Sequence, residues 1–238
     1  MKYLSKLPVV TGLCAVLGLV CLCIRQWLLS SGTDDKGLLT AGHPGMLLSV
    51  LLLAAAVCVL CFALRQQQVY RFRNSTLSIV SMLFFAIGYG CAAWQLLFSH
   101  SYPLYVITGI LGILCVLCAL AIAFCLIRKI RLHPLVFCPP VLFFMLFLVC
   151  RYQQWSGEPE LQRYLFQMLS VVTLMLSAYH RAALAADKKG VRSYLLVSRA
   201  AVFFCIAAIP GSAYGTLYGC AAVAIILDGF AASRKQGA

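Results

Sequence analysis

The chain has 238 residues, of which 63% are hydrophobic and 11% charged, and its formal net charge is +13. Soluble domains are about half apolar and about a quarter charged, so this composition excludes soluble globular, disordered and fibrous proteins. We predict an integral membrane protein whose surroundings are the lipid bilayer, and whose positive charge reflects topology, not binding of nucleic acid.

A helix needs roughly 20 apolar residues to cross about 30 Å of hydrocarbon. Charge-poor runs predict helices near residues 7–29, 46–64, 76–98, 104–127, 135–150, 164–186, 193–209 and 212–232. The predicted fold class is an all-α polytopic bundle, with residues 1–238 as a single transmembrane domain. No small-residue cleavage site follows the first run, so we predict a retained helix and not a signal peptide.

The number of helices depends on residues 209–212, which either kink one long helix or turn a hairpin of two short ones. With eight helices and a cytoplasmic N-terminus, most Lys and Arg residues fall on the cytoplasmic side, as is usual in a cell (plasma or inner) membrane. Seven helices, the alternative, would move Arg234 and Lys235 to the other side. We also expect the basic loops to attract anionic lipid headgroups.

Three of the predicted helices end alike at the outer face. Arg25 and Trp27 lie at the end of the first, Trp94 at the end of the third, and Arg151 and Trp155 at the end of the fifth. The five side chains could form a cationic, aromatic-lined pocket for an anionic or planar ligand. The arginines could equally pair with acidic residues of the outer loops, and the tryptophans could be ordinary interface residues.

The thirteen cysteines lie nearly all inside apolar runs, where we expect them to pack as small hydrophobic side chains. Cys58 and Cys61 share a helix face, as do Cys115 and Cys118, but neither pair has the second ligand pair of a structural metal site. We therefore predict no metal and no cofactor. Cys150 is placed at an outer helix end, where it could oxidise or pair.

The fifth predicted helix carries Pro134, Pro139 and Pro140 in its first turns, and each proline removes a backbone donor. One interpretation is a short helix that starts at Pro140. The other is an unwound segment that lines a cytoplasmic vestibule, because broken helices at membrane depth occur where protein or a wet cavity satisfies them.

Ionisable residues inside the last helices suggest a buried contact. Arg199 and Asp228 come level if the outer turn is centred near Ala213, and we predict an intramembrane ion pair between them. In the same segment Gly211, Gly215 and Gly219 recur every four residues. This spacing predicts a flat helix face that packs on a neighbour within the chain or in a second subunit.

The sequence lacks a phosphate-binding glycine loop, a His-Glu-x-x-His motif and a Gly-x-Ser-x-Gly motif, so no catalytic residue is assigned. A small-molecule transporter, or a membrane subunit of one, is the preferred function, with the outer pocket and the helix near 135–150 as ends of one pathway. The first alternative is a non-catalytic assembly or signalling partner in a homo- or hetero-oligomer. A lipid-modifying enzyme comes third, with His180, Asp187 or Asp228 as inner candidates.

Overall fold

The computed structural model describes residues 6–32, 44–64, 76–99, 102–128, 130, 133–155, 161–186 and 191–233. The regular elements in these residues are all helices, and most follow the apolar runs of the sequence. In chain order they are α1 (Lys6–Ser31), α2 (Pro44–Leu64), α3 (Thr76–Ser99), α4 (Pro103–Arg128), the 3-10 helix η1 (Pro134–Phe137), α5 (Cys138–Trp155), α6 (Leu161–Ala185), α7 (Val191–Ala208) and α8 (Gly215–Ser233).

Six of the described helices, α1 to α6, contain a segment that is long and apolar enough to cross a membrane. In α8 the apolar stretch Gly215–Ala231 is shorter. The 18 residues of α7 and the 19 of α8 correspond to roughly 27–29 Å at 1.5 Å per residue, close to the hydrocarbon thickness of about 30 Å. The chain is a multi-pass helical membrane protein, and eight crossings remain our expectation.

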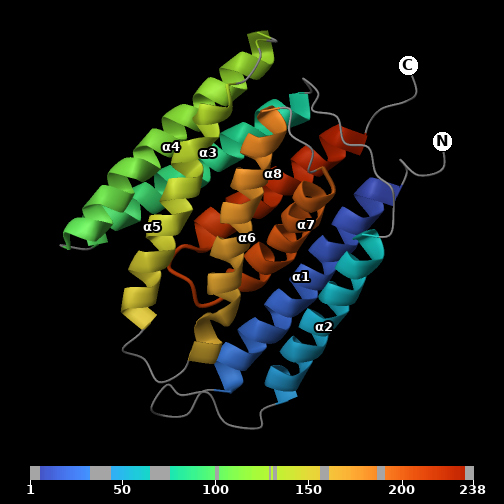
Figure 1. The fold of residues 1–238 in the computed structure, drawn as a ribbon. Helices are drawn as coiled ribbons and strands as arrows, with labels where there is room; N and C mark the ends of the chain where they lie inside the picture. The colour runs from blue at the N-terminus through green and yellow to red at the C-terminus, as the bar shows by residue number, and fades with distance from the viewer. Residues whose placement is uncertain are drawn as a thin grey trace.

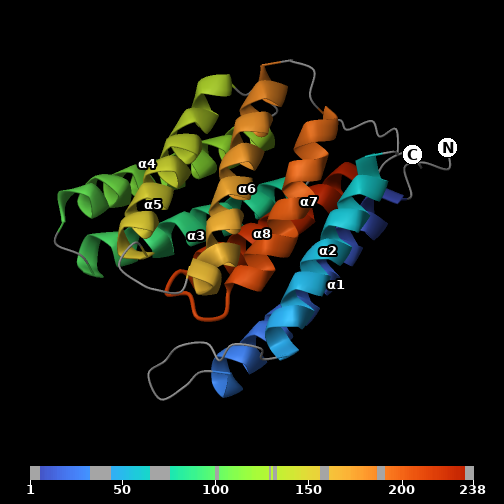
Figure 2. The same cartoon turned by 60° about the horizontal axis from the view of Figure 1, so that its bottom comes forward.

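The helices α7 and α8 form the centre of the bundle, and every residue from 198 to 208 is buried. The hairpin of α1 and α2 packs on one side of them, while α3 packs on α8 and α6 packs on α7. The helices α4 and α5 complete the other side (Figure 1). The beginning of α1 and the end of α8 lie at the same end of the bundle (Figures 1 and 2). We call it the inner end, because the sequence predicts that it faces the cytoplasm.

Close helix packing depends on glycines other than the predicted row. A Cβ atom on Gly112 would lie 2.9 Å from Ala93 Cβ, and one on Gly109 would lie 2.7 Å from Leu97 Cγ, so α4 fits against α3 only without these side chains. Gly88 gives α3 a similar approach to α8, where the distance to Cys220 Cβ would be 3.1 Å.

The glycines singled out in the sequence lie differently. Gly211 is in the turn before α8, with a φ angle of +69° that an L side chain rarely adopts, so it is not on the helix face. Gly215 and Gly219 lie on α8, and the nearest atoms to a Cβ at either position belong to Ile209 of the same turn. Gly215 and Gly219 therefore accommodate the α7–α8 turn, and packing of these two glycines on a neighbouring helix or a second subunit stays a prediction.

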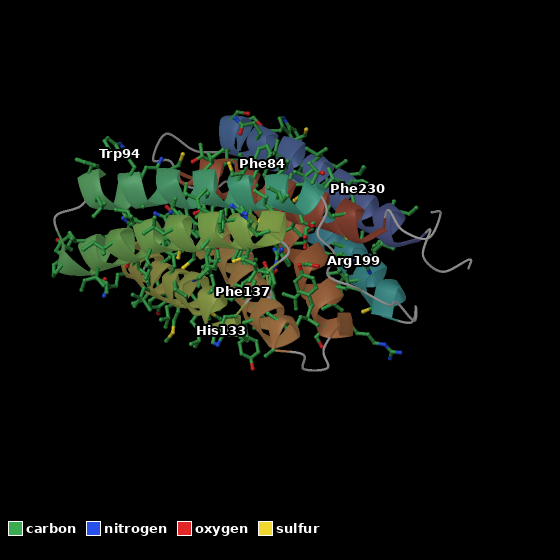
Figure 3. All side chains as sticks on the ribbon, turned by 90° about the horizontal axis from the view of Figure 1, so that it is seen from above. Phe84, Trp94, His133, Phe137, Arg199 and Phe230 are labelled. Atoms are coloured by element: carbon green, nitrogen blue, oxygen red, sulfur yellow. The ribbon has the colours of Figure 1, made fainter. Side chains whose placement is uncertain are left out.

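The prolines at the start of α5 lie in a 3-10 turn and in the first turn of a helix that begins two residues before Pro140. The ring of His133 accepts a hydrogen bond from the Leu135 amide at 3.4 Å, and Pro134 begins one 3-10 turn. The helix α5 then starts at Cys138, so Pro139 and Pro140 occupy its first turn, where a missing donor costs little. Phe137 is buried while His133 lies at the edge of the bundle (Figure 3).

Candidate functional site

The two arginines of the predicted outer pocket turn into the bundle and meet successive residues of α6. Arg25, on α1, lies with its Cζ 4.5 Å from the ring centre of Phe166. Arg151, near the end of α5, donates to Gln154 Oε1 and, at 3.1 Å, to Gln167 Oε1. Both side chains are more than 90% buried.

The tryptophans of the predicted pocket do not join these arginines. Trp27 is 46% exposed, and Trp94 is 66% exposed and points away from the bundle (Figure 3). The Trp94 ring packs on Phe98, with ring centres 4.1 Å apart, as expected of residues at a membrane interface. Trp155 ends α5, and its side chain lies outside the described residues. A common outer pocket stays a prediction, and of its four described side chains the two arginines lie inside the protein.

The contact between Arg151 and Gln167 can be tested by substitution. Gln167→Leu removes an acceptor from a buried guanidinium, and we expect the free energy of unfolding to fall by about 1.5–3 kcal/mol. Gln153→Leu, at an exposed position of α5 close to Arg151, is the control and should change it by less than about 0.5 kcal/mol. Denaturant unfolding in detergent measures both, and equal effects would show that Gln167 does not stabilise Arg151.

Five buried rings connect this outer region with the middle of the bundle. We call them the aromatic column: Tyr89, Phe143, Phe144, Phe147 and Tyr214. Tyr89 lies 5.4 Å from Phe143 and 5.7 Å from Phe144, measured between ring centres. Phe143 lies 5.7 Å from Phe147, which meets Tyr214 edge-on at 5.0 Å. Arg151 Cζ lies 5.1 Å from the Tyr214 ring and so ends the column at the outer side.

A cavity lies at the other end of the aromatic column, between α3, α4, α5, η1 and α6. The volume that the centre of a water molecule can occupy in it is about 40 Å³. Most of the lining side chains are apolar, and Ser177 and Arg181 add polar groups from one face of α6. Tyr89 and Phe144 of the aromatic column also line it, as do Phe137 and Pro140 from the irregular start of α5. Pro140 thus forms part of the cavity wall, while the cytoplasmic vestibule of the second interpretation stays a prediction.

Arg181 extends from this cavity to Asp228 on α8. Its Nη2 lies 3.3 Å from Asp228 Oδ1, and both side chains are more than 90% buried. Ser78 of α3 donates to the same oxygen at 3.4 Å, and the Tyr194 hydroxyl of α7 donates to Oδ2 at 2.9 Å. One carboxylate therefore joins α3, α6, α7 and α8 near the inner end.

Arg199 lies on the other side of this carboxylate. It lines a second, smaller cavity of about 10 Å³, together with Asp228, Tyr194, Ser198 and Thr11. Arg199 and Asp228 thus come to the same place, as the sequence suggested, while the ion pair shown for Asp228 is with Arg181. The predicted pair of Arg199 with Asp228 stays a prediction.

The remaining sequence candidates lie apart from the two cavities. The His180 ring packs edge-on against Tyr179, with ring centres 5.5 Å apart. Asp187 and the acids of the outer loops lie outside the described residues. Cys150 is fully buried with its sulfur 3.4 Å from Thr108 Oγ1, so it is not at an accessible helix end. Among the described residues, no group of three His, Cys, Asp or Glu could hold a metal ion.

Arg181 is a site residue that the sequence did not single out, because most Lys and Arg residues are assigned to the cytoplasmic side. A usable signal was present: Leu174, Ser177, Ala178 and Arg181 share one face of α6, with small residues next to a cation.

Comparison of the chain with protein families, with curated protein sequences and with solved structures found no match.

Proposed function

We propose that the chain is a transporter for a small solute, or the membrane subunit of one. The observation that carries this proposal is the cavity of about 40 Å³ inside the bundle, with a buried arginine on an otherwise mainly apolar wall. Ligand sites in membrane bundles are built in this way, from a few polar groups among apolar side chains. In an intramembrane setting a buried ionisable residue marks a functional position by default.

The elements around the cavity support a pathway that is closed toward the outer end. Toward the outer end the aromatic column fills the interior, and its five rings are at most 4% exposed. Toward the inner end an apolar cluster borders the cavity, and its members Met82, Ile122 and Phe137 line the wall. The aromatic column thus forms an outer barrier, whereas the cavity itself is only partly enclosed.

The outer barrier joins two parts of the bundle that could separate. Phe147 belongs to α5, whereas Tyr214 belongs to the turn between α7 and α8, and their rings meet edge-on. Arg151 holds the same Tyr214 from α5. Outward opening then requires α5 to move away from this turn, and Arg151 would exchange its protein contacts for water or solute.

The size of the cavity limits the solute. A volume of about 40 Å³ has room for roughly three water molecules, or roughly 90 Å³ of liquid. This corresponds to a compound of only about six non-hydrogen atoms. The proposal therefore favours small solutes over nucleotides, sugars of common size and whole lipids.

Filling the cavity should stop transport without unfolding the protein. We expect Ala178→Phe, at a position that lines the cavity, to abolish uptake of small solutes into proteoliposomes. Leu176→Phe, at a partly exposed position of the same helix, should leave uptake unchanged. Uptake is measured with a panel of labelled small acids, amines and alcohols, and folding by melting temperature. A folded wild-type protein that moves none of them would refute the proposal.

A further inference from the structure

We infer that the cavity binds a small aliphatic monocarboxylate through Arg181, and that this carboxylate competes with Asp228 for the guanidinium. The inference names the solute class of the transporter proposed above and uses the same cavity. It concerns binding, which can be measured whether or not the bound compound is transported.

The balance of buried charge favours an anion. Four arginines are more than 90% buried in the described part of the chain: Arg25, Arg151, Arg181 and Arg199. Asp228 is the single acidic residue among the described residues. Burying a cation is costly unless an anion or a set of acceptors lies near, so the interior is better suited to receive negative than positive charge. A cationic solute would meet the charge of Arg181 at the cavity wall, which Asp228 does not line.

The cavity wall matches a short carboxylate with an alkyl chain. The rings of Phe85, Phe137 and Phe144 and the side chains of Leu174 and Ile122 offer an apolar surface for methylene groups. Arg181 presents the planar donor set that binds a carboxylate with two parallel hydrogen bonds. Ser177, one helical turn before Arg181, adds a hydroxyl group to the same wall. A chain of about four carbons fits the available volume.

The existing partner of Arg181 can be displaced. Charge-assisted bonds between guanidinium and carboxylate are usually about 2.7–2.9 Å long, whereas Arg181 Nη2 lies 3.3 Å from Asp228 Oδ1. Asp228 also receives the Tyr194 hydroxyl at 2.9 Å, and shares the second cavity with Arg199. If a bound carboxylate replaces Asp228 as the partner of Arg181, Asp228 keeps these neighbours. The exchange therefore does not leave the side chain of Asp228 in an apolar site. Because Asp228 lies on α8 and Arg181 on α6, the exchange would also loosen one contact between these helices.

The test is titration of the purified protein with sodium butyrate in sodium gluconate, an anion too large for the cavity. We expect saturable butyrate binding by calorimetry, and no binding of 1-butanol. Arg181→Gln should abolish binding. Asp228→Asn, which removes the competing charge and keeps one acceptor oxygen for Tyr194 or Ser78, should strengthen butyrate binding about tenfold.

The two variants separate this inference from a purely structural ion pair. A structural role predicts that both variants weaken binding or leave it unchanged, and that result would overturn the inference. Binding of 1-butanol as tightly as butyrate would also overturn it, because the site would then recognise only the alkyl chain. If Asp228→Asn does not fold, Ala178→Phe in the wild-type background must still abolish butyrate binding. Butyrate that binds but is not taken up by proteoliposomes would leave this inference standing and refute the transport proposal.

Discussion

Asp228→Leu is expected to destabilise the protein by about 3–5 kcal/mol, since it leaves the guanidinium of Arg181 buried without its carboxylate. In the native structure Asp228 joins four helices through Arg181, Tyr194 and Ser78. Denaturant unfolding of the purified protein measures the loss. The expected effect is larger than that of an ordinary hydrogen bond because a charge loses its partner.

The double variant Asp228→Leu with Arg181→Met provides the control. Replacing both members of a buried ion pair by apolar residues is often neutral or even stabilising, because no charge remains to be desolvated. We therefore expect the double variant to recover most of the stability lost in Asp228→Leu. If it is at least as unstable as the single variant, Asp228 stabilises the bundle through Tyr194 and Ser78, and not through Arg181.

Gly112→Leu is expected to lower the free energy of unfolding by at least about 1–3 kcal/mol through overpacking. The first carbon of the new side chain would lie 2.9 Å from Ala93 Cβ and 3.1 Å from Phe143. Because Phe143 belongs to the aromatic column, the substitution would push apart α3, α4 and α5 around the cavity. Its effect should appear both in stability and in any activity that depends on the cavity.

Gly12→Leu is the matched control, since a Cβ at Gly12 would meet no atom within 4 Å. Leucine also favours a helix over glycine by up to about 1 kcal/mol, so this variant should be as stable as the wild type or slightly more so. Melting temperatures of the two variants, recorded side by side, decide the point. Equal loss in both would mean that α4 does not approach α3 as closely as the structure shows.

The sequence predicted the helices well because their signal is local. Each helix must supply about twenty apolar residues, so α2, α3 and α4 agree with the predicted ranges to within two residues. The largest difference is α5, predicted to end at Cys150 and found to end at Trp155. The predicted range ended before Arg151 because this residue is charged. In the structure the helix continues through Arg151, since its guanidinium contacts Gln154, Gln167 and Tyr214 inside the protein.

The candidate site was less predictable, because it depends on which helices become neighbours. An ionisable residue inside an apolar run was enough to single out Arg199 and Asp228, and both line one cavity. The ion partner of Asp228 comes from α6, 47 residues away in the chain, and periodicity says nothing about such a contact. Likewise the sequence positions of Arg25 and Arg151 predicted a pocket at the outer surface. The fold shows that the two side chains instead contact Phe166 and Gln167.

The central claim is that α7 and α8 cross the membrane as the seventh and eighth helices and so bring Asp228 back to the inner end. The most direct measurement is labelling of Ala213→Cys, at an exposed position of the α7–α8 turn, with a membrane-impermeant thiol reagent. Peptide mass spectrometry reads the modification at position 213 apart from the native cysteines. We predict labelling in intact cells and none from the inner face of inverted vesicles. Labelling only in inverted vesicles would contradict the eight-helix arrangement. It would also contradict the placement of the site at the cytoplasmic end.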